Sequence, residues 1–380
     1  MKTIHWLLLL LVLTGGCTQK YISPYHFPSV GYLVVEGYIN ADTFPTNFIL
    51  SRVTSLDSQY YVGEPGAVVN VESQNGAIFP IPDVGNGAYS GGPLPLDVNQ
   101  QYRVRITTSD GQQFLSDFAP VNITPPIDSV SWKTTSAGVN IYVSTHDPLN
   151  KIQYYQWKYD ETWEYNSAYE SGYEYLGGMI VSRPVSDMIY TCWQTNSSTD
   201  IIIGNSAKLK SNIIYEEPVT SVPYANSNKL TIEYSILVRQ YALTEDWYNF
   251  NQKIQKNTEN LGSIFDAQPS ELVGNIHCLT NPSEPVVGFI GCASETEARI
   301  FIQRGQLPGS QVILTGYEDC TEDTIANTPV ALSMAYGTGQ LIPVSLYYVG
   351  PSLAGIVGGP PFCVDCRLNG GFTQKPAYWQ

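Results

Sequence analysis

The feature that most constrains the fold is a series of short runs in which apolar and polar residues alternate. The first five runs are "GYLVVEGYIN", "TNFILSRV", "AVVNVES", "QYRVRITT" and "QQFLSDF". Alternation with a period of two is typical of strands that bury one face. Turn residues separate the runs at Asn75-Gly76, at residues 85–87 and at Asp110-Gly111. Such turn residues tolerate positive φ and favour tight hairpins, so the sequence predicts antiparallel strands.

The number and spacing of these runs predict an Ig-like β-sandwich over residues 31–124. Pro125 and Pro126 follow, and proline cannot donate a hydrogen bond to a strand ladder, so we place a domain boundary there. Later runs such as "GVNIYVST" and "ARIFIQR" have the same character. Residues 127–380 are therefore expected to form a larger β-rich domain, and the fold class is mainly β.

One stretch of the second domain has the period of a helix, at residues 245–261. Thr244 is a suitable N-cap, and two acidic residues follow it in the first turn, where the helix dipole favours negative charge. Gly262 suits the C-terminal end. The apolar residues of one face are Trp247, Phe250, Ile254 and Leu261. We expect Trp247 and Ile254 to pack against the sheet of the second domain.

Residues 154–175 place aromatic side chains on odd positions and most charged side chains on even ones. Because a strand directs successive side chains to opposite faces, this pattern predicts two aromatic-faced strands with a turn near Asn166 or Gly172. The rings have two interpretations, as a packed core or as a stacking platform for a ligand or partner. The candidate binding residues are Tyr155, Trp157, Tyr159, Trp163 and Tyr165.

The N-terminus has the pattern of an export signal. Lys2 precedes an apolar run from Trp6 to Leu13, which is shorter than the roughly 20 residues that a membrane-spanning helix needs. Small residues then lead directly to Cys17, as in a bacterial lipobox, although Thr14 stands where leucine is usual. We expect a lipoprotein signal peptide over 1–16, lipidation of Cys17, a tether over 17–30 and membrane attachment through the lipid anchor.

Six further cysteines follow Cys17, and an even number in an oxidising compartment favours disulfides. The spacing of the last two would also suit a redox or zinc site, but no helix signal follows them and no histidine lies at finger spacing. We expect a local pair between Cys278 and Cys292, because the residues between them resemble a hairpin. The expected disulfide residues are Cys192, Cys278, Cys292, Cys320, Cys363 and Cys366.

Catalytic sequence patterns are missing. The chain contains no G-x-S-x-G, no H-E-x-x-H and no phosphate-binding loop. The acidic stretch 317–324 could hold calcium, but a solvated acidic loop is the more common outcome. We therefore expect no enzyme activity, no cofactor and no metal. The formal net charge of −15 disfavours nucleic acid as a partner.

Several stretches taken together resemble a known family. They are "YLVVEGYIN", "QYRVRITTSDGQQFLSD", "PPIDSV", the segment from "LTEDWYNF" to "GNIHC", and "CVDCRLNGGFTQKPAYW". In this order they resemble domain-of-unknown-function family 4249, whose members are lipoproteins of Bacteroidota cell envelopes. The resemblance implies an outer-membrane location and a gene often found beside that of a TonB-dependent receptor. It supplies no catalytic residues.

The expected function is that of a non-catalytic binding or accessory lipoprotein of the outer membrane, with a TonB-dependent transporter as its partner. Two alternatives remain. The chain could be a structural or adhesive surface protein, or a hydrolase whose acidic residues are dispersed along the sequence.

Overall fold

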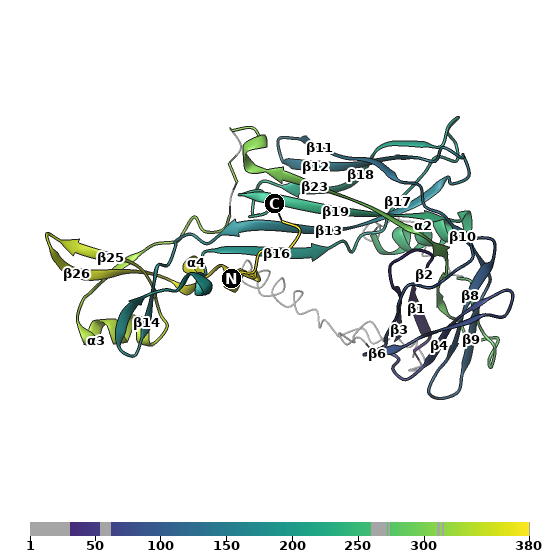
Figure 1. The fold of residues 1–380 in the computed structure, drawn as a ribbon, viewed down its shortest axis with the longest axis horizontal. Helices are drawn as coiled ribbons and strands as arrows, with labels where there is room; N and C mark the ends of the chain where they lie inside the picture. Colours follow the sequence, from purple (N-terminus) through teal and green to yellow (C-terminus); the bar gives the residue numbers. More distant parts are fainter. Residues whose placement is uncertain are drawn as a thin grey trace, which may run out of the picture.

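The computed structural model describes residues 31–379, apart from 54–61, 260–271, 273, 310–311 and 314. Strands dominate the described residues, which confirms the predicted mainly β fold class. The molecule is elongated, with two sheets at one end, two further sheets in the middle and a small lobe at the other end (Figure 1). The expected signal peptide, Cys17 and the tether 17–30 lie outside the described residues.

Two sheets at one end, here called the end sandwich, share one apolar core that includes Leu33, Phe48 and Val104. The alternating burial of strand β8, with Tyr102, Val104 and Ile106 inward, matches the period seen in the sequence. The Ig-like topology stays a prediction. The first sheet contains β1 (Leu33–Gly37), β3 (Thr46–Arg52), β6 (Asp83–Gly85), β7 (Ala88–Gly91) and β21 (Val287–Gly288). The second sheet contains β2 (Ile39–Asn40), β4 (Val68–Ser73), β5 (Ile78–Ile81), β8 (Gln101–Thr107), β9 (Gln113–Ser116), β10 (Ala119–Asn122), β20 (Ile276–Cys278) and β22 (Cys292–Ala293).

Residues 276–293 return to the end sandwich after the chain has built the middle of the molecule. Strand β20 pairs with β9, β21 runs parallel to β1, and β22 runs parallel to both β2 and β10. The prediction of two units that are each continuous in sequence, 31–124 and 127–380, therefore differs from the structure. Local alternation cannot reveal this return, because the partners of these strands lie far away in the sequence.

The expected disulfide between Cys278 and Cys292 is wrong, since both residues are buried free thiols. The segment between them does not form a hairpin. Cys278 lies opposite Phe114, and Cys292 lies opposite Val121, on a different strand. Burial raises the pKa of the Cys292 thiol to about 12, so this thiol is protonated at neutral pH.

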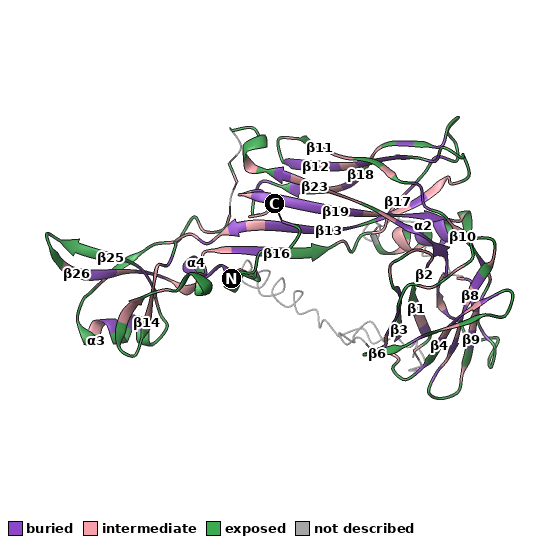
Figure 2. Cartoon of the chain, viewed as in Figure 1, coloured by how far each residue is buried: buried purple, intermediate pink, exposed green. Residues whose placement is uncertain are grey.

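The middle of the molecule is a second pair of sheets, here called the central sandwich. Its shared core is rich in aromatic residues and includes Trp157, Tyr165 and Tyr234, each completely buried. Strands β13 and β19, which carry these residues, are coloured as buried over much of their length (Figure 2). One sheet contains β11 (Ile127–Thr134), β12 (Gly138–His146) and β18 (Ile213–Pro223). The other contains β13 (Tyr154–Asn166), β16 (Thr191–Ser197), β17 (Ile202–Asn205), β19 (Glu233–Leu243) and β23 (Glu295–Gln303).

Helix α2 (Glu245–Glu259) confirms the expected helix up to residue 259, while residues 260–262 lie outside the described residues. Thr244 Oγ1 accepts a hydrogen bond from Trp247 N at 3.2 Å, as an N-cap does. The helix packs where the two sandwiches meet. Trp247 lies 6.1 Å from the Tyr38 ring, and a Cβ at Gly291 would come within 2.1 Å of the Trp247 ring. Close packing at this junction therefore requires glycine at 291.

The other end of the molecule is formed by residues 173–182 and 323–359, here called the distal lobe (Figure 1). Its hairpin β14–β15 does not pair with β13, so the hairpin expected within residues 154–175 does not form. The lobe contains β14 (Tyr173–Leu176), β15 (Met179–Ser182), β24 (Asp323–Ala326), α3 (Pro329–Leu332), η3 (Ser333–Gly337), β25 (Ile342–Val349) and β26 (Ser352–Gly359). Short helices elsewhere are η1 (Val185–Asp187), η2 (Arg304–Gln306), α4 (Pro361–Val364) and η4 (Cys366–Asn369).

Two disulfides, Cys192–Cys366 and Cys320–Cys363, lie at the base of the distal lobe. The first joins the C-terminal segment to β16. The second closes the part of the chain that forms β24, β25 and β26. These bonds confirm the expected oxidised state for four of the six cysteines.

The connectivity gives a direct prediction for peptide mapping of the unreduced protein. Alkylation followed by mass spectrometry should find the pairs Cys192–Cys366 and Cys320–Cys363 as linked peptides, with Cys278 and Cys292 as alkylated monomers. A linked peptide that contains Cys278 and Cys292 would contradict the structure.

The turn between β12 and β13 depends on one buried carboxylate. Asp147, whose exposed fraction is 6%, accepts hydrogen bonds from Leu149 N at 2.9 Å, Lys151 N at 2.6 Å and Ile152 N at 2.7 Å. Burial opposes ionisation of this carboxyl, but the backbone donors outweigh burial and hold its pKa below the ordinary value. Asp147 therefore stabilises the folded state in its ionised form.

We expect Asp147→Asn to lower the free energy of unfolding at pH 7 by about 1–3 kcal/mol, because the amide cannot accept as strongly from three donors. A carboxyl with a lowered folded pKa stabilises above its unfolded pKa of about 3.9 and loses that contribution as pH falls through the folded pKa. Denaturant unfolding at several pH values should show the two proteins converging below about pH 4. A difference that persists unchanged at acid pH would refute this origin.

Candidate functional site

The five aromatic side chains predicted as a possible binding platform are buried in the central sandwich. Tyr155, Trp157 and Tyr165 are completely inaccessible, and Trp157 Nε1 donates to Gln240 Oε1 at 2.8 Å inside the core. Tyr159 and Trp163 have exposed fractions of 8% and 5%. Strand β13 lies inside its sheet, and its odd positions face the shared core. The burial fits the interpretation as packing and leaves no ring face for a ligand.

The distal lobe carries the most unusual surface among the described residues. From Thr324 to Val364 the chain contains no Asp, Glu, Lys, Arg or His, although the whole protein has a net charge of −15. The hairpin residues 175–182 are also uncharged. Glu174 lies within β14 and Arg183 follows β15, and their charged groups pair at 3.8 Å. Apart from Glu174, which pairs with Arg183, and Asp323 at the start of β24, the distal lobe is therefore an uncharged end on an acidic molecule.

Large apolar side chains are exposed on this uncharged lobe. Met179 at the hairpin and Val330 on α3 have exposed fractions of 65% and 71%. The turn between β25 and β26 is mostly exposed as well (Figure 2). A gathering of exposed apolar side chains marks an interaction surface more often than isolated ones do. The exposed apolar residues of the lobe are Leu176, Met179, Val330, Met334, Tyr347, Tyr348 and Val349.

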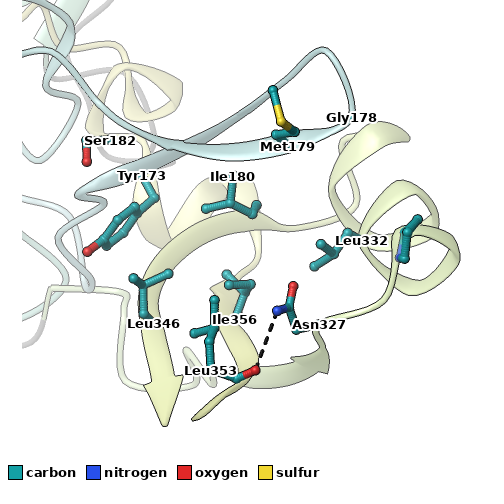
Figure 3. Close-up of a pocket in the computed structure, with 11 residues that line it drawn as sticks. Tyr173, Gly178, Met179, Ile180, Ser182, Asn327, Leu332, Leu346, Leu353 and Ile356 are labelled. Carbon is teal, nitrogen blue, oxygen red and sulfur yellow. Dashed lines mark hydrogen bonds between the residues drawn. The ribbon is translucent and has the colours of Figure 1, made fainter. Parts of the chain in front are cut away.

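A pocket of about 480 Å³ opens between the hairpin β14–β15 and the sheet β24–β26. Figure 3 shows Ile180 on the hairpin facing Leu346, Leu353 and Ile356 on the sheet, with Leu332 at one side. The neutral polar residues of the lining are Tyr173, Ser182 and Asn327. Such a pocket has the walls of a site for an apolar group and no charged group to bind an ion.

The small core beneath the pocket is firmly hydrogen-bonded. Tyr336 lies on the buried side of η3 and donates from its hydroxyl to Ile356 O at 2.9 Å. Burial, together with the nearby Asp323, raises the pKa of Tyr336 to about 12, so its hydroxyl remains a donor at neutral pH. The floor of the pocket is thus fixed by a bond between the two elements that carry it.

A second pocket, of about 430 Å³, is polar and lies at one end of the central sandwich. Glu164 and Glu233 are direct cross-strand partners and both line it. Glu164 Oε2 accepts from Trp379 Nε1 at 2.9 Å, and Glu233 Oε1 accepts from Gln303 Nε2 at 3.1 Å. This is where the structure brings two dispersed carboxylates together. Both are engaged in bonds that anchor neighbouring segments.

The acidic loop considered for calcium uses one of its carboxylates internally. Glu318 accepts from Thr315 N at 2.6 Å and from Gly316 N at 2.8 Å, which closes a turn. In the parts of the chain that the structure describes, no three His, Cys, Asp or Glu side chains gather as metal ligands would. Over the same residues, no helix has both the length and the apolar character needed to cross a bilayer.

Charged and phenolic groups also meet where the two sandwiches join. Arg239 lies 2.5 Å from Asp160 Oδ2 and 3.1 Å from Glu295 Oε1, and Tyr38 donates to Glu295 Oε2 at 2.9 Å. Burial raises the pKa of Tyr38 far above its ordinary value, and the nearby Tyr241 and Glu295 add to this effect. These groups bond to one another, so the cluster joins the sandwiches rather than presenting free ligand donors.

No motif in the sequence predicts the distal lobe as a site. A signal was available, because a charge-free stretch from Thr324 to Val364 is unusual in a chain with 14% charged residues. What the sequence could not provide is the hairpin β14–β15, which contributes half of the pocket from a distant segment.

Comparison with known proteins gives one family match. A family model described as "Domain of unknown function (DUF4249)" matches residues 22–299, most of the chain. Comparison with curated proteins gives no match. A solved structure titled "Biofilm associated protein - BSP domain" aligns at 8% identity and a TM-score of 0.13 over 76% of this chain. The alignment spans only 62% of that structure, and at this TM-score it carries no argument.

The assignment of the aromatic residues to the core can be tested by substitution. Trp157→Ala should lower the free energy of unfolding by about 3–5 kcal/mol, since it removes a buried indole and its hydrogen bond to Gln240. Denaturant or thermal unfolding would measure the change. A variant of unchanged stability that had lost partner binding would contradict the core assignment.

Proposed function

The chain belongs to the DUF4249 family, and on that premise we propose that it is a non-catalytic binding or accessory lipoprotein of the outer membrane that works with a TonB-dependent transporter. Export and a lipid anchor are supported by the signal-like segment 1–16 and by Cys17 directly after it. Disulfides at the base of the distal lobe support an oxidising compartment.

The observation that carries the binding role is the uncharged, apolar surface of the distal lobe. Exposed apolar surface of this kind is unfavourable in water. Its burial on binding is favourable by about 25 cal/mol for each Å² of apolar surface buried. The polar pocket offers less support for a hydrolase, because Glu164 and Glu233 already accept structural hydrogen bonds.

The arrangement of the molecule suits an accessory role. The expected tether 17–30 leads into β1, which belongs to the end sandwich, whereas the distal lobe lies at the opposite end of the elongated molecule (Figure 1). Anchoring at one end leaves the other end free to reach a neighbour in the same membrane. An adhesive protein would need only an exposed patch, whereas this lobe also contains a pocket.

Affinity purification from detergent-solubilised envelopes tests the proposal. The full-length tagged protein should enrich a TonB-dependent transporter, identified by mass spectrometry, at least about tenfold over an unrelated bait with the same lipid anchor, which corresponds to about 1.4 kcal/mol of preference. Recovery of no transporter from cells that express one would count decisively against the proposed partnership.

A further inference from the structure

We propose that the pocket of the distal lobe is a socket for an uncharged, apolar segment of a partner protein, which inserts a large apolar side chain between the hairpin β14–β15 and the sheet β24–β26. The inference rests on the proposed function in that it assumes an envelope partner. It adds the site of contact and the chemistry of the partner's segment.

Charge determines which segment can enter. The aliphatic walls, which include Ile180, Leu346 and Ile356, offer no counter-ion, and the stretch Thr324–Val364 supplies none. Burying a charged group without a partner is strongly unfavourable, so a charged segment would be rejected. An apolar side chain would replace water on the pocket walls and leave no ion unpaired.

The hairpin that forms one wall is preformed. Its turn is Gly177-Gly178, with φ of 58° and 90°, and Leu176 lies directly opposite Met179 in the ladder. Two consecutive residues of positive φ match the tight turn that glycine favours. Little backbone freedom is therefore lost on binding, and Leu176 and Met179 are held exposed beside the pocket.

The lining also favours a polypeptide over a lipid. Tyr173, Ser182 and Asn327 add neutral donors and acceptors to the apolar walls. Asn327 Nδ2 lies 3.5 Å from Leu353 O, a long contact that leaves the amide able to bond elsewhere (Figure 3). Backbone amides of an inserted segment can use such groups, whereas an acyl chain cannot. A flat bilayer surface would touch the protruding side chains but leave the pocket unfilled.

Site-specific photocrosslinking in native envelopes tests the location. The full-length protein would carry p-benzoylphenylalanine in place of Met179. A matched control carries it in place of Ile78, an apolar residue on β5 of the end sandwich with an exposed fraction of 61% against 65% for Met179. We expect irradiation to link position 179, but not position 78, to another protein within an uncharged apolar stretch of that protein.

Any other crosslinking result at position 179 would refute the proposed socket. A phospholipid or lipid A adduct would assign the lobe to the membrane, and a link to a second copy of the chain would assign it to self-association. A link within a charged stretch, or no product at position 179, would also refute the inference. Recovery of a transporter by affinity purification without this crosslink would leave the proposed function standing. A crosslink from position 179 to an uncharged apolar stretch of a protein other than a transporter would support the socket and count against the proposed transporter partnership.

A charge placed at the rim provides the second measurement. Met179→Lys should reduce the co-purified partner at least about tenfold, because an ammonium would face apolar walls. Met179→Leu should retain binding, and Ile78→Lys should have no effect. Thermal unfolding of each variant checks that the lobe is intact, which the exposure of Met179 leads us to expect. Full binding by a folded Met179→Lys variant would overturn the proposal.

Discussion

The distal lobe depends on the two disulfides at its base. Its own buried core is small, with Leu332, Ala335, Tyr336 and Ile356 as the buried apolar residues, and a core of this size stabilises little by itself. Cys320–Cys363 closes a loop of sequence separation 43 that contains three strands of the lobe. Restricting such a loop in the unfolded chain contributes about 2–4 kcal/mol in typical proteins. The disulfides thus add stability that the small core of the lobe does not provide.

Hydrogen bonds at the same place align the lobe with the central sandwich. Tyr165 donates from its hydroxyl to Cys366 O at 2.7 Å, Ser167 donates to Val364 O at 2.8 Å, and Tyr169 donates to Cys320 O at 2.6 Å. These residues belong to the end of β13 or follow it directly. The aromatic strand that fills the central core therefore also positions the segment from which the hairpin β14–β15 emerges. The packing of β13 in the central core therefore also determines where the distal lobe is attached.

Features with a local period could be predicted from the sequence. Alternation identified the strands of the end sandwich, and helical spacing identified α2 to within its described end. Features that depend on distant partners could not. The return of residues 276–293 to the end sandwich and the free state of Cys278 and Cys292 follow from pairings with β1, β9 and β10, which no local pattern specifies. The alternation correctly places the aromatic residues on one face of β13. That this face belongs to the core follows from the facing sheet β11–β12–β18, whose position no local pattern specifies.

In the proposed function, the distal lobe is the surface that binds a partner, and the acidic body carries the lobe. Hydrogen–deuterium exchange of the purified protein, compared with the purified complex that affinity capture yields, would locate the binding surface. We expect slower exchange in peptides of the complex that cover residues 173–182 and 341–359, with little change over 31–124. Protection confined to the end sandwich, with unchanged exchange across the lobe, would contradict the proposed binding surface.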